Sequence, residues 1–290
     1  MIRQALQWKT GSRNHELGHR TLIMGVVNVT PDSFSDGGKY LDPEGAVAHA
    51  LLLAGQGADI LDVGGESTRP GAAPVSQEEE IRRVVPVIRG IRAGNPDILI
   101  SVDTSKSAVA AEALSAGADI INDVRAGQGD PEMLPLAASS GAGLVLMHMQ
   151  GLPETMQLNP RYEDVLSELR NFFAERLRAS EKAGVKPEQI ALDPGIGFGK
   201  TLTHNLQILA GLPAFFDLGR PLLLGVSRKR WIGELTGRGV EERLAGSLAG
   251  AAACVNRGAN ILRVHDVIES CDLVKILDKV NQVNVHASPC

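Results

Sequence analysis

The chain repeats one pattern along almost its whole length: a short apolar run, a polar residue at its end, a loop containing glycine, and an amphipathic helix. Eight apolar runs stand in this setting, at 21–28, 58–64, 98–103, 118–123, 143–148, 190–193, 221–227 and 260–265. The helical patterns cover 44–56, 76–93, 105–116, 131–140, 162–183, 203–210, 240–257 and 266–280. Apolar runs that alternate with helices are typical of parallel strands buried on both faces.

This strand–helix repeat predicts an α/β protein of the (β/α)8 TIM-barrel class, with a single domain. The length of 290 residues suits one such domain. A doubly wound open sheet is the alternative, because periodicity does not show whether the sheet closes. We expect an N-terminal extension at 1–20 that can form a hairpin across the bottom of the barrel, a barrel over 21–280, and a tail at 281–290.

The charge balance and the cysteines limit which binding partners and which cellular compartment we expect for the protein. Acidic residues outnumber basic ones 34 to 29, for a net charge of −5, whereas nucleic-acid and membrane-surface binders carry a basic face. The sequence therefore predicts neither of these partners. It contains no run of about 18 apolar residues and no signal-peptide core. Cys254, Cys271 and Cys290 are odd in number and lack paired spacing, so we expect free thiols and a cytoplasmic protein.

Each apolar run ends in polar residues, namely Asn28, Asp62, Asp103, Asn122 and Asp123, His148, Asp193, Ser227, Arg263 and His265. In a TIM barrel these ends meet at one mouth, where the chemistry is carried out. Strand ends are also polar because loops are solvated, and this explanation is adequate for Asp62. It is less adequate for the acids in "SVD", "IND" and "LDPG", since isolated carboxylates beside apolar runs are costly.

Two glycine-rich loops follow the first two strands. The first belongs to "MGVVNVTPDSFSDGG" (24–38) and the second to "VGGESTRPGA" (63–72). Arg69 in the second loop suits a planar anion such as a carboxylate, although a lone surface arginine is usually just solvated. Because both loops lie at one barrel mouth, we interpret them as mobile and able to close over a ligand.

The stretch "DPGIGFGKT" (193–201) only partly resembles nucleotide-binding loops. Pro194 occupies the first glycine position of the phosphate-binding pattern, and Lys200 occupies the last glycine position of the dinucleotide pattern. We reject both interpretations. The glycines are better explained by a backbone that passes close to a ligand, with Phe198 lying against it; an ordinary strand–helix loop is the alternative.

Cations gather in "GVSRKRWIG" (225–233) and "RVHD" (263–266), where barrels often bind phosphate. We expect at least one of Arg228 and Arg230 to face solvent. His148 is interpreted as a satisfied core residue, because no ligand spacing around it supports a metal. Any metal should be a hard cation such as Mg²⁺, bound by phosphates and one or two protein groups, and Asn28 is suitably placed.

These residues predict a mouth with an acidic and a basic side. Asp103, Asn122 and Asp193 would bind a planar ring that presents adjacent N–H donors, as a 2-amino-pyrimidinone does. Lys229, Arg263 and His265 would hold a phosphate or pyrophosphate leaving group.

The motifs above, together with "ISVDTSKSAVAAEALSAGADIINDV" and "MHMQGLPETMQ", resemble the pterin-binding family, and within it the dihydropteroate synthases of folate biosynthesis. The resemblance runs from about Thr21 to Asp266 in the family's order. It implies a transferase that condenses dihydropterin-CH2-pyrophosphate with p-aminobenzoate and releases pyrophosphate, with sulfonamides as competitors. Related pterin-binding methyltransferases share the barrel but not the first two loops.

The resemblance also implies roles for individual residues. It assigns the pterin slot to Asp103, Asn122, Asp193, Lys229, Met147, Phe198 and Gly225. It assigns pyrophosphate to Asn28, Thr68, Arg263 and His265, with Mg²⁺ at Asn28, and p-aminobenzoate to Phe34, Thr68, Arg69, Pro70 and Lys229. Asp36 would stabilise a transient methylene cation, so that Asp36, Lys229, Arg69 and Asn28 are the expected catalytic residues.

Two alternative functions, one question of assembly and one departure from the family pattern stay open at this point. A corrinoid-dependent methyltransferase or a catalytically silent pterin binder could use the same barrel. The apolar patterns at 240–257 and 266–280 could supply the face of a homodimer. Arg230 follows Lys229 where many family members carry serine, so it could bind the p-aminobenzoate carboxylate or face solvent.

Overall fold

A computed structural model describes residues 5–30, 42–67, 74–151 and 155–282. Its strands are β1 (Leu6–Thr10), β2 (Arg13–Leu17), β3 (Leu22–Asn28), β4 (Ile60–Gly64), β5 (Leu99–Asp103), β6 (Ile120–Asp123), β7 (Gly143–Met147), β8 (Ile190–Asp193), β9 (Leu223–Gly225) and β10 (Ile261–Val264). Its α-helices are α1 (Pro43–Gly55), α2 (Gln77–Gly94), α3 (Ser107–Ser115), α4 (Met133–Ser140), α5 (Val165–Lys182), α6 (Leu202–Ala210), α7 (Arg230–Thr236), α8 (Leu244–Asn256) and α9 (Val267–Gln282). Strands and helices alternate from β3 onwards, as the apolar rhythm predicts.

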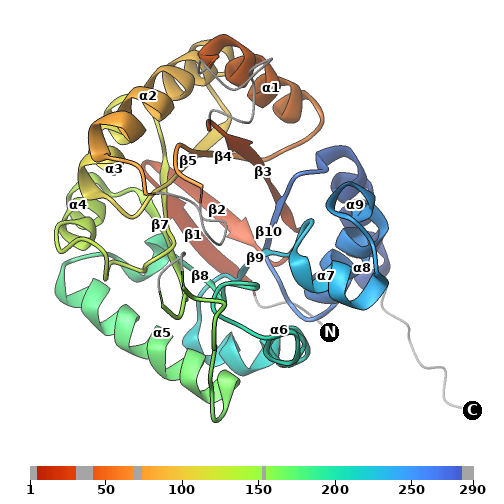
Figure 1. Cartoon of the computed structure of the whole chain (residues 1–290). Helices are drawn as coiled ribbons and strands as arrows, with labels where there is room; N and C mark the ends of the chain where they lie inside the picture. Colours follow the sequence, from red (N-terminus) through yellow and green to blue (C-terminus); the bar gives the residue numbers. More distant parts are fainter. Residues whose placement is uncertain (1–4, 31–41, 68–73, 152–154, 283–290) are drawn as a thin grey trace, which may run out of the picture.

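The parallel strands close into a barrel with the helices outside (Figure 1). Their order is β8-β7-β6-β5-β4-β3-β10-β9 in an eight-stranded sheet. Its two edge strands are joined by a parallel bridge between Leu192 and Leu222, where the Leu192 amide donates to the Pro221 carbonyl at 2.8 Å. The structure therefore confirms the barrel and excludes the open sheet.

Alternate residues on each strand serve two separate cores, because side chains on a strand point to opposite faces. One face packs against the helices in a large apolar cluster. The other face fills the inside of the barrel with a smaller cluster, which contains Met24, Ile60, Leu99, Ile120, Val145, Ala191, Leu223 and Ile261. The barrel is thus a packed core up to this level, and any ligand must lie beyond it, towards the strand ends.

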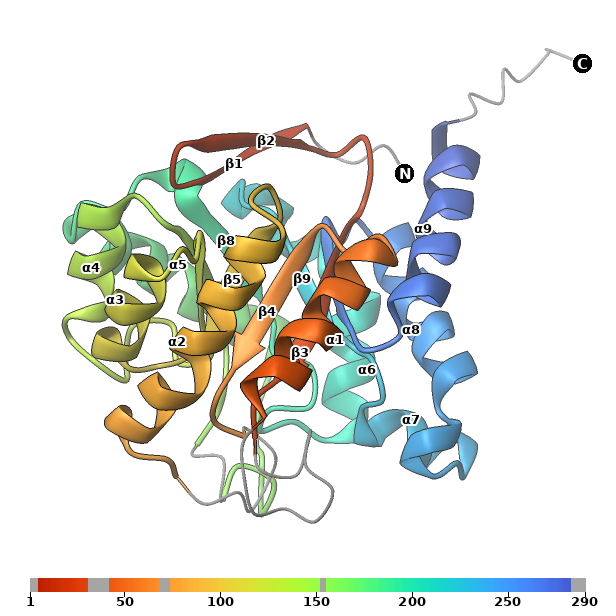
Figure 2. The same cartoon turned by 90° about the horizontal axis from the view of Figure 1, so that it is seen from above.

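A β-hairpin of β1 and β2 covers the end of the barrel at which the strands begin (Figure 2). Trp8 and Leu17 of this hairpin belong to the inner cluster and are fully buried. The Trp8 indole N–H donates to the Gln189 carbonyl at 2.9 Å, which satisfies its only polar group. The hairpin therefore works as a plug for the bottom of the barrel.

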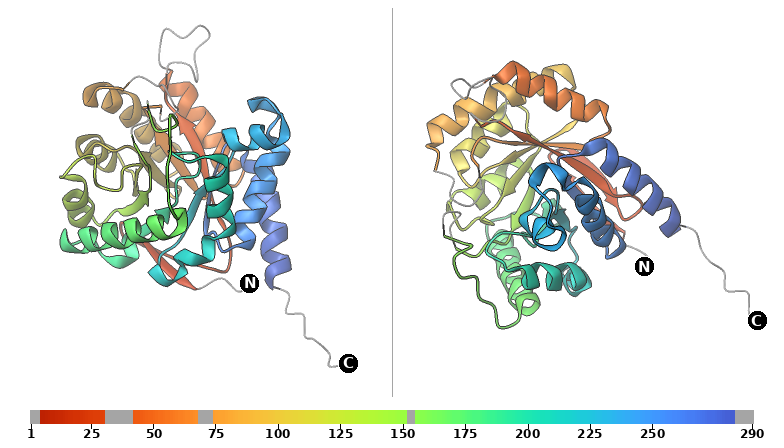
Figure 3. Two further views of the ribbon diagram at one scale, coloured as in Figure 1. Left: turned by 60° about the horizontal axis from the view of Figure 1, so that its bottom comes forward. Right: turned by 45° about the vertical axis from the view of Figure 1, so that its right-hand side comes forward.

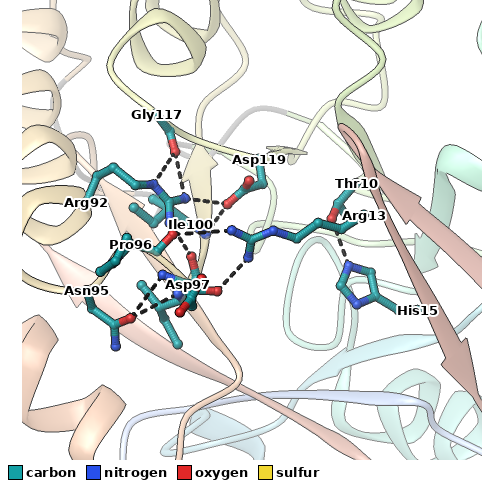
Figure 4. Close-up of polar contacts among 11 residues, drawn as sticks. Thr10, Arg13, His15, Arg92, Asn95, Pro96, Asp97, Ile100, Gly117 and Asp119 are labelled. Atoms are coloured by element: carbon teal, nitrogen blue, oxygen red, sulfur yellow. Dashed lines mark hydrogen bonds and ion pairs between the residues drawn. The ribbon is translucent and has the colours of Figure 1, made fainter.

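Arginines fasten this bottom end through backbone carbonyls (Figure 4). Arg13 of β2 donates to the Asp97 carbonyl at 2.5 Å. Arg92 of α2 donates to the carbonyls of Gly117 and Ile98 and pairs with the Asp119 carboxylate at 2.6 Å. The loops before β5 and β6 are thereby tied to each other and to the hairpin.

The last third of the chain differs from its predicted helices. The pattern at 240–257 is divided into a short 3-10 turn and α8, and α7 is an additional helix at 230–236 that the sequence reading did not separate from the basic motif. Helices α8 and α9 pack side by side on the outside of the barrel, where α9 contacts β3 (Figure 3). The division of the chain at residues 20 and 280 into extension, barrel and tail stays a prediction.

Candidate active site at the barrel mouth

One ring of inward-facing side chains lies directly above the inner apolar cluster. Each member stands two positions beyond a cluster residue on the same strand, so it points to the same interior. The ring contains Val26, Asp62, Ser101, Asn122, Met147, Asp193, Gly225 and Arg263. Asn28 and Asp103 stand one further step up β3 and β5. A closed barrel therefore brings most of the predicted site residues together.

Arg263 lies among the acids rather than opposite them. Its Nε donates to Asp62 Oδ2 at 2.6 Å and its Nη2 donates to Asp103 Oδ2 at 2.8 Å. Burial lowers the pKa of the guanidinium, but the two carboxylates outweigh this and raise it. The expectation of an acidic side facing a separate basic side is wrong for this residue, which neutralises the acidic side.

Asp62 is a central member of the ring, so solvation of a strand end does not explain it. Its carboxylate is fully buried, and it accepts from Asn122 Nδ2 at 3.2 Å as well as from Arg263. Asp123 instead belongs to the opposite face of β6, where its carboxylate accepts from the backbone amides of Arg125 and Gly127. Of the two polar residues that end β6, only Asn122 therefore reaches the mouth.

Burial raises the carboxyl pKa values at the mouth. The pKa of Asp103 is raised, because desolvation and the nearby Asp62 outweigh the attraction of Arg263. Asp193 has a pKa of about 6, again mainly through desolvation, although the Gly195 amide donates to its Oδ1 at 2.7 Å. Perturbed carboxyls gathered in one cleft are typical of binding and catalytic sites.

Lys229 extends over the Phe198 ring, with its Nζ 4.1 Å from the ring centroid. Burial lowers its pKa to about 8, helped by the positive Arg263. Arg228, just before it, has a φ of +57°, a strained conformation for a residue with a side chain. A bidentate pair with Asp266 holds Arg228 there, with Nη2 to Oδ1 at 2.6 Å. The strained turn delivers Lys229 to the mouth and leaves Arg228 as a structural brace.

His265 is a neutral group in this site. Burial lowers its pKa to about 4, and Arg263 and Arg228 add to the effect. Its Nδ1 lies 3.1 Å from Ser227 Oγ, which orients the ring. His265 can therefore meet an anion as a neutral hydrogen-bond donor, and it does not add a second positive charge at neutral pH.

The loop after β8 approaches the end of β7 very closely. A Cβ on Gly195 would lie 2.0 Å from the His148 carbonyl and 3.4 Å from Met147 Cγ. Lys200 connects the two segments by hydrogen bonds: its Nζ lies 3.0 Å from His148 Nδ1 and donates to the Phe198 carbonyl at 3.0 Å. His148 is thus a satisfied buried residue, as predicted, and Met147 and Phe198 are held on adjoining loops.

Asn28 and Gly225 complete the described part of the predicted site. The Asn28 backbone is paired with Gly64, beside the Asp103 side chain. In the part of the chain that the structure describes, no protein group occupies the Asn28 amide oxygen, which fits a hard cation that takes its other ligands from phosphate. Gly225 lies next to Arg263, and a Cβ there would lie 3.8 Å from the Arg263 side chain.

Five predicted site residues, Phe34, Asp36, Thr68, Arg69 and Pro70, lie outside the described residues. The structure shows the flanks of the second loop. Glu66 accepts from the Val75 amide at 2.9 Å and from Lys106 Nζ at 2.6 Å, and Lys106 also binds the buried Glu80 at 2.5 Å. This ion cluster joins the two stems of the loop that carries Thr68 and Arg69.

Sequence reasoning missed Asp62, Lys200 and Ser227 as parts of the mouth. A signal for Asp62 was present, because Asp62 falls in register with Ile60 and Gly64 inside an apolar run, and a charge buried on both sides needs a partner. Lys200 gave no comparable signal. Its contacts depend on how closely the loops after β7 and β8 approach, which no local pattern records.

Comparisons with known proteins agree with this geometry. The family model described as "Pterin binding enzyme" matches residues 24–265. The Escherichia coli dihydropteroate synthase is 50% identical over 256 residues, which cover 88% of this chain and 90% of the relative. The chain therefore belongs to the pterin-binding enzyme family.

Solved structures narrow the class. The Xanthomonas albilineans dihydropteroate synthase with 4-aminobenzoic acid has a TM-score of 0.90 and 47% identity, covering 97% of this chain and 100% of that one. The same enzyme with 7,8-dihydropteroate has a TM-score of 0.86 and 45% identity over 96% and 99%. The Yersinia pestis enzyme with a sulfonamide drug has a TM-score of 0.90 and 43% identity over 96% and 100%. Within its family the chain belongs with these transferases, and its activity is dihydropteroate synthesis in the folate pathway.

Proposed function

We propose that the barrel mouth condenses dihydropterin-CH2-pyrophosphate with p-aminobenzoate by letting pyrophosphate leave before the amine attacks. The observation that carries the choice of substrate is the ring of acceptors at Asp103, Asn122 and Asp193, with Lys229 and Arg263 beside it. Such a ring complements a planar heterocycle with N–H donors on one edge and an acceptor on the other.

In this proposal the pterin lies flat at the mouth. Asp193, Asn122 and Asp103 accept from the donors on its edge, and Lys229 donates to its carbonyl side. Phe198 and Met147 form the walls, and Gly225 leaves room for the ring. The closeness of Lys229 to Phe198 supports the arrangement, since the ammonium and the aromatic wall already define one corner of a slot.

The leaving group would lie above Asn28, Arg263 and His265, with Thr68 from the second loop. Asn28 would hold Mg²⁺ together with phosphate oxygens, and that ion would neutralise charge that develops on the departing pyrophosphate. His265 would donate as a neutral imidazole. Departure before attack leaves a methylene cation conjugated with the ring, and Asp36 would stabilise this cation from the first loop.

The second substrate would bind between the two glycine-rich loops. Phe34, Pro70 and Lys229 would enclose the p-aminobenzoate ring, and Arg69 would pair with its carboxylate. Sulfonamides would compete there because they resemble this substrate in shape and charge. Binding would be ordered, with the pterin substrate first, if the loops complete the pocket only over bound pyrophosphate.

The order of binding gives the first test. Calorimetry with p-aminobenzoate should show strong binding when Mg²⁺, pyrophosphate and a pterin are present and at least tenfold weaker binding without pyrophosphate. Equal affinities in the two conditions would exclude the ordered model. Turnover of p-aminobenzoate separates a synthase from a corrinoid-dependent methyltransferase, which would not consume it.

The role of Arg69 gives a second test. Arg69→Ala should raise the KM for p-aminobenzoate by roughly 10–100-fold, because a charge-assisted bidentate pair contributes about 1.5–3 kcal/mol. The KM for the pterin substrate should change by less than about threefold. Equal changes in the two constants would argue against the proposed position of Arg69.

We also propose a homodimer and a cytoplasmic location. Ile268, Ile276 and Val280 on α9 expose large apolar side chains, as does Leu244 on α8. Ile276→Glu should convert the dimer to a monomer in sedimentation equilibrium, whereas Leu158→Glu, at an equally apolar exposed site away from α9, should not. Cys254 and Cys271 are free and buried, which fits a reducing compartment. None of the helices in the described parts of the chain is long and apolar enough to cross a membrane.

A further inference from the structure

A buried carboxylate beneath the proposed pterin slot is only half used by the protein. Asp62 Oδ2 accepts from both Arg263 Nε and Asn122 Nδ2. Asp62 Oδ1 is fully buried and has no hydrogen-bond partner among the described residues. Ser101 pairs with Asp62 across β4 and β5, and its buried Oγ also has no hydrogen-bond partner among the described residues. Leaving a buried oxygen without a donor costs about 1–3 kcal/mol.

This arrangement is unlike the carboxylates at the other end of the same strands. Asp59 precedes β4 and uses both oxygens, one for the Ile23 amide at 2.8 Å and one for Arg20 at 2.8 Å. A residue retained only for stability would be expected to resemble Asp59. Because unsatisfied buried groups concentrate at functional sites, the position of Asp62 calls for a role in function.

The chemistry of the contact fixes the direction of the Asn122 side chain. An ionised carboxylate accepts hydrogen bonds and cannot donate them, so only the NH2 group of Asn122 can face Asp62. The Asn122 carbonyl oxygen must then point away from Asp62. No described residue donates to that oxygen, although Asn122 is 4% exposed. Asn122 is thus prepared as an acceptor at the mouth, and it is not free to turn its amide donor to the ligand.

The same carboxylate restrains Arg263. Its Nε contact to Asp62 and its Nη2 contact to Asp103 hold the guanidinium between the two strands. Without Asp62, Arg263 would have Asp103 as its remaining carboxylate partner, and the Asp103 oxygens would be less available to a ligand. One buried side chain thus influences two groups of the proposed pterin edge.

We propose that Asp62 is a positioning residue for the pterin substrate, which sets the Asn122 amide as an acceptor and keeps Arg263 from monopolising Asp103. This inference rests on the proposed pterin edge, and it adds a residue that touches no substrate. It predicts that Asp62 determines affinity for the pterin substrate and has little influence on p-aminobenzoate.

The test compares Asp62→Leu with Asp59→Leu. Both replace an aspartate of the same strand segment by an apolar side chain of similar size, one beneath the mouth and one at the bottom. Calorimetry with dihydropterin pyrophosphate and Mg²⁺ should give a Kd raised by about 10–100-fold for Asp62→Leu and by less than threefold for Asp59→Leu. Asp62→Asn, which restores one acceptor oxygen, should recover most of the affinity. The KM for p-aminobenzoate at saturating pterin should stay within threefold of the wild type in every variant.

Two outcomes would overturn the proposal, and a parallel variant identifies which proposal has failed. If Asp62→Leu binds the pterin substrate like the wild type and loses only thermal stability, Asp62 is structural. If Asn122→Ala also leaves the affinity unchanged, the pterin edge itself is wrongly placed. A loss of affinity in Asn122→Ala with none in Asp62→Leu refutes only the positioning role.

A second measurement covers the case in which Asp62→Leu does not fold. The side-chain NH2 signal of Asn122 in the ¹⁵N-labelled wild type, assigned from its loss in Asn122→Asp, should be protected from exchange both with and without the pterin substrate. Loss of protection without the ligand, or a large ¹⁵N shift that shows donation to the ligand, would contradict an amide held by Asp62.

Discussion

The carboxylates at the two ends of the barrel differ in pairing and in burial, since those at the bottom are partly exposed. At the bottom, Asp119 accepts from the Ile100 amide and from Arg92, and Asp59 accepts from the Ile23 amide and pairs with Arg20. At the mouth, Asp62 has one oxygen without a partner among the described residues, and Asp103 and Asp193 have pKa values raised by burial. Aspartates at the bottom are thus paired with amides and arginines, whereas aspartates at the mouth have an unpartnered oxygen or a raised pKa.

This difference indicates that the bottom of the barrel contributes to stability and the mouth contributes to ligand binding. The bottom contains the hairpin plug and the arginine contacts that tie the loops before β5 and β6 to each other and to the hairpin (Figure 4). The mouth holds carboxylates whose charged form is destabilised by burial, and at Asp103 and Asp193 a ligand that supplies N–H donors would offset this cost. Changes at the bottom should therefore lower stability without affecting binding, and changes at the mouth should affect binding with little loss of stability, or even a gain.

The largest expected effect is on binding at the mouth. Asp193→Asn should weaken binding of the pterin substrate by at least about 100-fold, which corresponds to about 2.7 kcal/mol. The substitution turns one acceptor into a donor that opposes a ring N–H, so a charged hydrogen bond is lost and a repulsive contact replaces it. Calorimetry with dihydropterin pyrophosphate measures the effect directly, and an unchanged Kd would refute the assignment of Asp193 to the ring edge.

The matching change at the bottom should lower stability and leave binding of the pterin substrate unchanged. Arg92→Met should lower the free energy of unfolding by about 3 kcal/mol, because it removes donors to three carbonyls and leaves Asp119 without its cation. Urea unfolding measures this loss. The Kd for the pterin substrate should stay within twofold of the wild type. A loss of affinity comparable to that of Asp193→Asn would show that the two ends are coupled.

A smaller effect concerns stability at the mouth. The Asp193 pKa is about 6 in the folded chain against a usual 3.8. Below about pH 3 the group is protonated in both states, and between about pH 4 and 6 the unfolded chain has released a proton that the folded chain keeps. The Asp193 carboxyl therefore lowers the free energy of unfolding by an amount that grows as the pH rises through this window and is constant above it. An asparagine at this position does not titrate, so Asp193→Asn should gain about 3 kcal/mol on the wild type between about pH 4 and pH 8.

Urea unfolding at several pH values between about 4 and 8 checks this gain. A constant difference between Asp193→Asn and the wild type across the window would mean that burial of Asp193 carries no electrostatic cost. The comparison of the two ends would then lose its basis at this residue.

Much of this architecture could be predicted from local pattern. The apolar runs fall within two residues of most strand boundaries, for example 190–193 for β8 and 98–103 for β5, because buried parallel strands require continuous apolar residues. Helix α7 was hidden, since its residues lie inside a basic motif with little amphipathic pattern. The hairpin was anticipated at the correct end, and the barrel required the long-range closure between Leu192 and Leu222 to be established.

The pairing at the mouth could not be predicted in the same way. Arg263 and Asp62 are 201 residues apart in sequence, so no local pattern links their charges. Sequence reasoning found which strand ends carry chemistry but divided them by charge into two sides. Burial favours the opposite solution, because a buried guanidinium and buried carboxylates are costly apart and tolerable together.

Arg230 tests the boundary of the mouth and gives the smallest expected effect. It begins α7 immediately after Lys229, yet its side chain is 81% exposed and pairs with Glu234 at 2.8 Å. Exposed pairs four residues apart on a helix contribute about 0.3–0.5 kcal/mol. Arg230→Ser should therefore change the free energy of unfolding by less than about 0.5 kcal/mol and the KM for p-aminobenzoate by less than twofold. A clear rise in that KM would place Arg230 at the carboxylate of the second substrate and extend the mouth by one residue along α7.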